Sequence, residues 1–386
     1  MNFQVQFPFL YVKKKKPGPS IIDLSNNKLS GFIPFRIGYC RYLFSLNLGR
    51  NNLTGNIPIE VLQQNSVLHH LQLNDNNLSG CPLDFISKLA YLRVVSLANN
   101  KFGGTIPTVF NSSLLRILSL RSNKFNGSIP KEISNLQNLQ ILDLSQNNLT
   151  GIIPRTVGNL QRLVSKPTEL FPIGGEIGLL FQMSLKGNMM QFQKLYSYSA
   201  GIDLSCNDLE GNIPEEIGQL KGLPTLNLSH NRFSGVMPPS VGSMSGLESL
   251  DSSFSNLSGK IPHSLVSVRY LGYLNLSYNN LSGRIPREAH FDTLSGDGSA
   301  YANNTLLCGF YTNHVCEDDQ RSNPPNGSYE DVKDKLLLYA IVALGFAVGF
   351  WGLFFVLLLK KEKWWFVYWR LINVVAVRVV DCMLKD

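Results

Sequence analysis

Apolar and polar residues follow one short pattern that recurs along most of the chain. The pattern is clearest in LNLGRNNLTGNIP, which begins at Leu46, and in LNLSYNNLSGRIP, which begins at Leu274. The first apolar residue of each copy falls at Ile22, Leu46, Leu71, Val95, Leu118, Leu142, Ile202, Leu226, Leu250 and Leu274. Subtracting neighbours gives spacings of 24, 25, 24, 23, 24, 60, 24, 24 and 24 residues. This regular period predicts a solenoid of stacked units.

Each position of the repeat has an expected role. Leu46 and Leu48 should point into the core, while Ser45 and Asn47 alternate with them and face solvent on a concave sheet. Asn51 should turn inward, where its amide can satisfy backbone groups as the chain leaves the strand. Stacked copies of this residue predict an asparagine ladder of Asn27, Asn51, Asn76, Asn100, Asn123, Asn147, Asn207, Asn231 and Asn279.

The period and the ending of the repeat together predict the fold class. A period near 24 residues lies within the range of leucine-rich repeats. The Gly-x-Ile-Pro ending resembles the plant extracellular type of these repeats. We therefore expect an α/β solenoid, a right-handed leucine-rich-repeat superhelix with a parallel β-sheet on its concave face, plus one transmembrane helix.

Two copies and one insertion depart from the pattern. The third copy ends in GCPLD without the usual Ile before Pro82, so the backbone should bulge there. The ninth copy places Ser252 where a core leucine belongs and Ser255 where the ladder asparagine belongs. Burying Ser252 without a partner should cost on the order of 1–3 kcal/mol. Residues 162–200 lack the pattern, and long insertions of this kind are either functional or disordered.

The two ends of the chain differ from the repeats. Residues 1–19 make a poor secretory signal, because two glutamines and a proline interrupt the apolar run and the lysines follow it. We interpret this end as truncated or incorrectly assigned, and the alternative is a weak signal-anchor.

Residues 336–359 are 24 positions without a charge, which predicts a transmembrane helix. Lys360, Lys361 and Lys363 then place the tail in the cytoplasm, and its 27 residues are too few for a kinase domain.

Composition excludes several other classes of protein. The formal net charge of +8 is spread along the chain and is not gathered in an aromatic-interleaved strip, so we expect no nucleic acid as a partner. Six cysteines in 386 residues do not form a disulfide scaffold. His69 and His70 are adjacent and are interpreted as solvated, so we expect neither a metal site nor a cofactor. No catalytic residues are predicted, and the chain is not expected to be an enzyme.

Asparagines in Asn-x-Ser/Thr acceptors are frequent before the predicted transmembrane helix. Such acceptors are expected to be glycosylated when a chain enters the secretory route. They occur at Asn52, Asn77, Asn111, Asn126, Asn148, Asn227, Asn256, Asn275, Asn280, Asn303 and Asn326.

From about residue 20 to 370 the chain resembles the plant leucine-rich-repeat receptor-like proteins, including those that perceive fungal products. The resemblance rests on the repeat type, on KGNMMQFQKLYSYSAGIDLS at 186–205, which is similar to the island region of that family, on the LCG…C ending and on GFAVGFWG at 345–352. The signal peptide, cysteine cap and many N-terminal repeats typical of the family are absent. The family implies a disulfide between Cys308 and Cys316 in a C-terminal cap.

These observations predict eight segments. They are a non-repeat N-terminal segment (1–19), repeats one to six (20–161), an island (162–200), repeats seven to ten (201–290), a C-terminal cap (291–316), an acidic stalk (317–335), a transmembrane helix (336–359) and a cytoplasmic tail (360–386).

The predicted function is that of a single-pass plasma-membrane receptor-like protein with extracellular repeats and no kinase domain. It would bind an extracellular peptide, protein or glycan and signal in plant defence through a partner receptor-like kinase. The alternatives are a truncated, non-signalling receptor fragment and an inhibitor of cell-wall hydrolases, although the latter should lack the membrane helix. Candidate ligand contacts are the solvent-facing strand positions Arg50, His69, His70, Gln72, Asp75, Arg93, Arg116, Arg121 and Gln146.

Two of these predictions concern specific pairs of residues. Arg93 and Arg116 occupy the same repeat position and should stack as a basic pair suited to an acidic ligand. Gly345 and Gly349 are four apart, so they share one face of the predicted helix and permit close packing against a partner helix. The kinase adaptor or co-receptor is therefore expected to bind through this helix and the C-terminal repeats.

Overall fold

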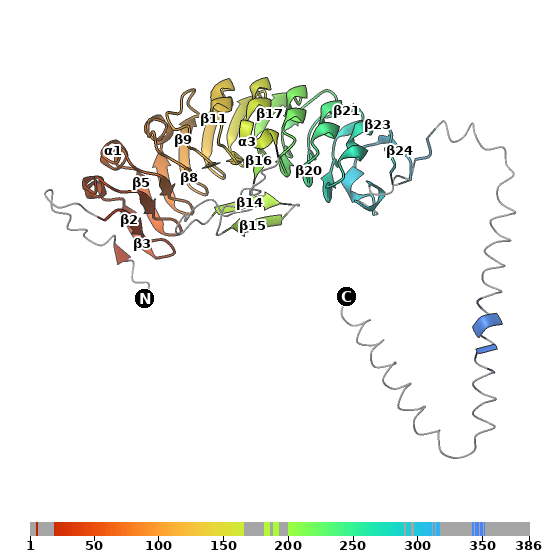
Figure 1. Cartoon of the computed structure of the whole chain (residues 1–386), viewed down its shortest axis with the longest axis horizontal. Helices are drawn as coiled ribbons and strands as arrows, with labels where there is room; N and C mark the ends of the chain where they lie inside the picture. Colours follow the sequence, from red (N-terminus) through yellow and green to blue (C-terminus); the bar gives the residue numbers. More distant parts are fainter. Residues whose placement is uncertain are drawn as a thin grey trace, which may run out of the picture. The chain divides into compact units, whose positions relative to one another are not determined.

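The structure is a computed structural model of the whole chain, and part of the chain can be described in it. The described residues are 5–6, 19–165, 181–185, 188–192, 200–288, 291–294, 297–310, 312, 314–316, 342, 344–346, 348–349 and 351. The chain divides into two units, Met1–Cys316 and Glu317–Asp386. Figure 1 shows the repeats of the first unit side by side in chain order.

A ten-stranded parallel sheet joins the repeats. Its strands are β2 (Ile21–Asp23), β4 (Ser45–Asn47), β6 (His70–Gln72), β8 (Val94–Ser96), β10 (Ile117–Ser119), β12 (Ile141–Asp143), β16 (Gly201–Asp203), β18 (Thr225–Asn227), β20 (Ser249–Asp251) and β22 (Tyr273–Asn275). The central residues pair in register from Ile22 with Leu46 to Leu250 with Leu274. The ten apolar positions found in the sequence therefore form one row, and the predicted solenoid with a parallel sheet is confirmed.

A second parallel sheet was not predicted. It contains β1 (Val5–Gln6), β3 (Leu29–Phe32), β5 (Asn52–Asn56), β7 (Asn77–Gly80), β9 (Lys101–Thr105), β11 (Lys124–Gly127), β13 (Asn148–Gly151), β17 (Asp208–Gly211) and β19 (Arg232–Phe233). Near the C-terminal end, β21 (Ser258–Lys260), β23 (Asn280–Arg284) and β24 (Leu306–Cys308) form a three-stranded sheet. These strands use the Asn-Leu-Ser/Thr-Gly part of the repeat, whose glycine has a positive φ, for example 78° at Gly55.

Short helical turns complete the repeats, and most of them are 3₁₀ helices. They are η1 (Phe35–Tyr39), η2 (Lys131–Asn135), η3 (Arg155–Asn159), η4 (Glu215–Gln219), η5 (Pro239–Ser243) and η6 (His263–Ser267), with α1 (Ile59–Gln63), α2 (Leu83–Ile86) and α3 (Gln161–Val164). The proline before a turn is extended, as at Pro130 with ψ 143°, and fixes where the turn begins. Pro82 instead has ψ −22°, so the backbone of the third repeat departs locally from the extended conformation that prolines such as Pro130 have at this position. Two more turns, η7 (Phe291–Thr293) and η8 (Ser299–Tyr301), precede β24.

The asparagine ladder is confirmed. Asn123 Nδ2 donates to the carbonyl oxygens of Leu97, Leu120 and Arg121 at 2.9, 3.0 and 3.1 Å. Its Oδ1 accepts from the N–H of Phe102 at 3.0 Å. Asn304, which the sequence analysis missed, makes the same set of bonds after the tenth repeat. At the ninth repeat, Ser255 offers only a hydroxyl, which lies 3.5 Å from the oxygen of Asn231.

The sheet positions that alternate with the core were expected to face solvent, and for Ser45 and Asn47 this was wrong. These residues are only 4% and 5% exposed. Parallel strands lie about 4.8 Å apart, so short side chains on one face shield one another. Asn47 Nδ2 also donates to Asp23 Oδ2 of the neighbouring strand at 3.3 Å.

The insertion contains an antiparallel hairpin. Its strands are β14 (Phe181–Leu185) and β15 (Asn188–Phe192), and Leu185 pairs with Asn188, so the connection is the two residues Lys186 and Gly187. Two-residue connections ending in glycine are typical of hairpins, which is the sequence feature that could have identified it. The rest of the predicted island lies outside the described residues.

Cys308 and Cys316 form a disulfide beside β24, with a Cα–Cα distance of 5.1 Å. In the second unit the described residues between 342 and 351 are helical. None of the helices in the described part of the chain has the length and hydrophobicity needed to cross a membrane. Most of the predicted transmembrane segment, the stalk, the tail and Asn326 lie outside the described residues.

Candidate ligand-binding site

Three columns of side chains run along the ten-stranded sheet, because each repeat places the same backbone position beside that of its neighbour. The leading column is the residue before each strand, and it includes Phe44, His69, Arg93, Arg116 and Gln140. The strand column is the last residue of each strand, and it includes Gln72, Asp143, Asp203, Asn227 and Asp251. The left-handed column has positive φ and comprises Asn26, Arg50, Asp75, Asn99, Ser122, Gln146, Cys206, His230, Phe254, Tyr278 and Asn303.

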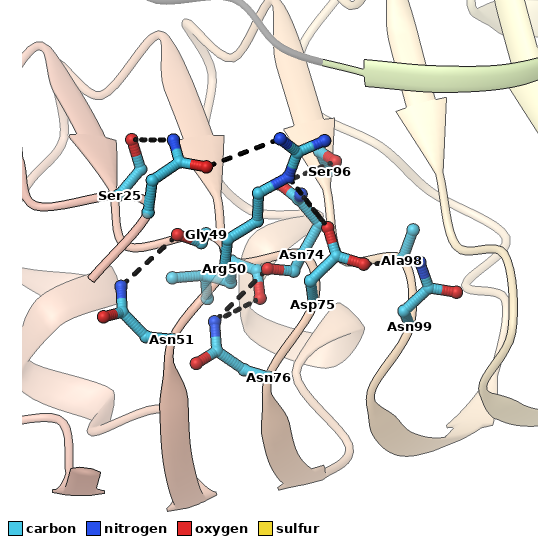
Figure 2. Close-up of polar contacts among 12 residues, drawn as sticks. Ser25, Gly49, Arg50, Asn51, Asn74, Asp75, Asn76, Ser96, Ala98 and Asn99 are labelled. Carbon is cyan, nitrogen blue, oxygen red and sulfur yellow. Dashed lines mark hydrogen bonds and ion pairs between the residues drawn. The ribbon is translucent and has the colours of Figure 1, made fainter. Parts of the chain in front are cut away.

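Arg50 and Asp75 lie in a polar network of the left-handed column (Figure 2). Arg50 Nε is 3.5 Å from Asp75 Oδ2, and the two side chains are 29% and 30% exposed. Asp75 also accepts hydrogen bonds from Asn74 Nδ2 at 2.8 Å and from Asn99 Nδ2 at 2.6 Å. Arg50 Nη1 donates to Asn26 Oδ1 at 3.4 Å. A ligand that bound these two predicted residues would have to compete with their existing partners.

The two histidines occupy different environments. His69 stacks between Phe44 and Tyr91, with ring centroids at 4.2 and 5.9 Å, and its Nδ1 donates to the oxygen of Val67 at 2.7 Å. His70 is only 4% exposed, so the interpretation that it is solvated and faces a ligand was wrong. Burial, followed by the charges of His69 and Arg93, lowers the pKa of His70 to about 4 and keeps its ring neutral.

Gln72 is also unsuited to direct ligand contact. Its side chain lies in the strand column and is 1% exposed. As with Ser45 and Asn47, the neighbouring strands shield it. Gln146 lies at the exposed left-handed position and accepts a hydrogen bond from the hydroxyl of Ser122.

The three predicted arginines lie close along the sheet but not in one column. Arg93 and Arg116 are neighbours in the leading column, where the N–H of Arg116 donates to the oxygen of Arg93 at 2.8 Å. Both side chains are half-buried, and so is that of Arg121, which follows β10 at the opposite end of the strand. The positive charge of Arg121 lowers the pKa of both Asp143 and Asp203, although burial outweighs it. The arginines therefore border the middle of the sheet at both ends of its strands.

Asp143 and Asp203 form a buried acidic pair that the sequence analysis did not identify. They face each other on β12 and β16, which the insertion separates in the chain. Asp143 Oδ1 accepts from the hydroxyl of Ser145 at 2.6 Å, and Asp203 Oδ1 accepts from that of Ser205 at the same distance. Burial, and then the charge of Asp203, raises the pKa of Asp143 to about 7. Burial also raises the pKa of Asp203.

The pair could have been found from the repeated words LDLS at 142–145 and IDLS at 202–205. Their equivalent positions become neighbours once the insertion is removed from the count. Chemically, the half-buried arginines offer donors to an anionic group, whereas Asp143 and Asp203 are only 0% and 1% exposed and are unsuited to direct ligand contact.

The stacked repeats and parallel sheets define the class as a leucine-rich-repeat protein. The family model described as "Leucine rich repeat" matches residues 113–165. A second model, "Leucine Rich Repeat", matches residues 20–40, 91–113, 222–244 and 270–290.

Sequence similarity to known proteins indicates which kind of leucine-rich-repeat protein this chain resembles. The chain is 32% identical over 239 residues to Receptor-like protein 35 of Arabidopsis thaliana, which covers 53% of this chain and 25% of that protein. It is 33% identical over 251 residues to Receptor-like protein 53 of the same plant, and this match covers 56% of this chain and 26% of that protein. The chain is similar to these plant leucine-rich-repeat receptor-like proteins, and it spans about a quarter of their length.

A solved structure is similar over most of the repeats. It is the Arabidopsis receptor kinase HAESA in complex with the peptide hormone IDA and the co-receptor SERK1. The TM-score is 0.55 at 30% sequence identity, and the match covers 77% of this chain and 47% of that one.

Proposed function

We propose that this protein is a cell-surface receptor-like protein. It binds an extracellular ligand along the sheet of repeats one to six and signals in plant defence through a partner receptor kinase. The observation that carries the proposal is the placement of half-buried arginines before strands β8 and β10 and after β10, in a solenoid similar to receptor-like proteins. A binding module needs such polar groups held on a rigid scaffold, and it needs no catalytic group.

The ligand is expected to be acidic, because Arg93, Arg116 and Arg121 concentrate positive charge over two repeats. The guanidinium group is planar and binds carboxylates through paired hydrogen bonds. The similarity to the HAESA complex supports a peptide as the ligand and a co-receptor as the partner. Gly345 and Gly349, which are helical and have open space where a Cβ would lie, support contact with the partner through a helix of the second unit.

The test measures the binding of a short poly-aspartate peptide to the full chain. Replacing Arg93, Arg116 and Arg121 together by Ala should weaken binding roughly tenfold or more, since one charge-assisted hydrogen bond contributes about 1.5–3 kcal/mol. The matched control replaces the exposed Lys101, Lys124 and Lys131 by Ala, which removes the same net charge from another surface. Equal losses in the two triple variants would show only general electrostatic attraction and would contradict a site at the arginines.

A further inference from the structure

The left-handed column ends in three aromatic rings on the C-terminal repeats. His230 stacks on Phe254 with ring centroids at 4.2 Å, and Phe254 stacks on Tyr278 at 4.1 Å, with 11° between the planes in both cases. We call these residues the aromatic stack. Their φ angles are 52°, 52° and 54°, a region that bulky side chains rarely adopt.

The aromatic stack is open to solvent, but its ring faces are not equally open. Phe254 is 41% exposed and Tyr278 is 46% exposed. Both faces of the Phe254 ring are covered by its two neighbours, whereas Tyr278 has one face on Phe254 and the other toward the next repeat position. Within the described part of the chain, Phe254 is the only ring stacked on Tyr278. The surface available for stacking is therefore the outer face of Tyr278.

Asn303 occupies the position next to that face. The N–H of Tyr278 donates to the oxygen of Ala302 at 2.8 Å, and the N–H of Leu281 donates to Asn304 Oδ1 at 3.0 Å, which fixes the register between these segments. Asn303 has a φ of 56°, and its side chain is exposed. It is thus the next member of the left-handed column after Tyr278, and its side chain leaves the backbone in the same direction.

Asn303 is also the asparagine of an Asn-x-Thr acceptor, completed by Asn304 and Thr305. Two other glycosylation acceptors differ from Asn303 in exposure and in hydrogen bonding. Asn227 and Asn275 lie half-buried in β18 and β22, where each Oδ1 accepts from the hydroxyl of its own acceptor serine at 2.8 Å. Asn303 combines an exposed carboxamide with a neighbouring aromatic face.

We propose that Asn303 carries an N-linked glycan whose first sugar packs on the outer face of Tyr278. This rests on the proposed function, because the repeats must enter the secretory route. In the transfer, Asn303 Nδ2 forms a bond to the anomeric carbon of a lipid-pyrophosphate-linked oligosaccharide. The bond from that carbon to the pyrophosphate breaks, the lipid pyrophosphate leaves, and the amide gives up one proton to the base that assists the transfer.

The packing follows from the dimensions and charges of the groups. A sugar joined to Nδ2 begins where the short asparagine side chain ends, which is level with the outer part of the longer tyrosine ring in the adjacent repeat. The C–H groups of a sugar carry partial positive charge and are attracted to the negative face of an aromatic ring. The glycan would cover the end of an exposed aromatic surface that otherwise favours unwanted association.

The test expresses the full chain behind a heterologous secretory signal peptide in eukaryotic cells and measures site occupancy by mass spectrometry. Asn303 should be occupied, as should the exposed Asn126 and Asn148. Release of the Asn303 glycan by a peptide-N-glycosidase, without denaturation, is then followed with time. Stacking should slow release roughly three- to tenfold relative to Tyr278→Asn, which removes the ring but suits a positive φ.

Two controls make the outcome specific. Tyr278→Phe keeps the ring and should retain slow release, and the glycan at Asn280, which begins β23, should be released at the same rate in every variant. An empty Asn303 beside occupied Asn126 and Asn148 would overturn this inference and leave the proposed function intact, as would a release rate unchanged in Tyr278→Asn. If none of the acceptors were occupied, the extracellular location in the proposed function would fail as well.

Discussion

At the scale of single residues, the carboxyl groups whose pKa values are raised by burial lie within the sheet and not at its rim. Asp143 and Asp203 occupy neighbouring positions of the strand column, and each binds one serine through one carboxylate oxygen. Two carboxylates this close cannot both ionise without a large electrostatic cost. The charge of Arg121 offsets only part of that cost, since the pKa of Asp143 is still raised to about 7.

We predict that the Asp143 carboxyl favours folding more strongly at pH 5 than at pH 8, whereas His70, whose pKa is lowered to about 4, favours folding more strongly at pH 8. The folded-state pKa of Asp143 is raised above its unfolded value, so its contribution is fully present at low pH and is lost as the pH rises through about 7. The loss should be on the order of 2 kcal/mol, observable as a change between pH 5 and pH 8 in the stability difference between wild type and Asp143→Asn. Asp143→Asn should flatten this dependence, whereas Asp251→Asn, in the same column but half-buried, should preserve it. A stability difference between wild type and Asp143→Asn that stayed constant from pH 5 to pH 8 would refute this interpretation of the pair.

Ser252 provides a second prediction at this scale. Its side chain is 1% exposed, and its hydroxyl has no hydrogen-bond partner within the described residues. The equivalent residues of the flanking repeats, Leu228 and Leu276, are fully buried core leucines. Ser252→Leu should therefore stabilise the repeats by about 1–3 kcal/mol, and Leu228→Ser should destabilise them by a similar amount or more. Denaturant unfolding of both variants measures this, and a destabilised Ser252→Leu would mean that the ninth repeat has closed around the serine.

At the scale of elements, the asparagine ladder connects the turns that follow the strands. From Asn51 onward, each ladder residue uses its whole carboxamide, with the nitrogen donating to three carbonyl groups and the oxygen accepting from one N–H, as Asn147 does between Leu120 and Phe125. Because these backbone groups are partly or fully buried, they have no water to replace a lost partner. The ladder thus satisfies buried backbone groups at each repeat boundary where the asparagine is present.

We predict that Asn123→Ala lowers the free energy of unfolding by about 2–4 kcal/mol, since it leaves several backbone groups without a partner. Ser255→Asn, which restores the ladder at the ninth repeat, should raise it by about 1 kcal/mol. Urea unfolding at a single pH compares the two variants with the wild type. If Ser255→Asn were destabilising, the ninth repeat would not share the backbone geometry of its neighbours.

Several of these elements were predictable from the sequence, and the others show where such prediction stops. The positions of Leu46 and Asn51 follow from local spacing, because the strand and the turn after it form within one repeat. The second sheet around Leu53 and the burial of His70 depend on contacts between repeats, which a single repeat does not encode. The Asp143–Asp203 pair joins two stacked repeats that the insertion separates in the chain, so neither copy alone indicates it.

At the scale of the whole molecule, a solenoid separates chemical functions along its length. Each repeat contacts only its neighbours, so a column can change character from one end to the other. The left-handed column is charged at Arg50 and Asp75 and aromatic at Phe254 and Tyr278. A ligand on the charged repeats and a partner or glycan on the aromatic repeats can therefore be bound at once without sharing residues.

The last prediction concerns the second unit. Its described residues between 342 and 351 are helical, and Val342, Phe346 and Val348 are exposed apolar side chains. Gly345 and Gly349 have open space where a Cβ would lie, so another helix can approach the backbone there. Within a membrane, helices associate through close packing across small residues, because lipid supplies no hydrophobic drive.

Replacing Gly345 and Gly349 together by Leu should therefore reduce the receptor kinases that co-purify with the full chain roughly fivefold or more. The measurement is quantitative mass spectrometry of a tagged chain extracted from plant membranes at matched expression. The control is Leu344→Phe, which enlarges a side chain on another face of the same helix and leaves the glycine face open. Undiminished co-purification of every kinase in the glycine variant would limit this segment to anchoring, and the partner contact would then have to lie on the repeats.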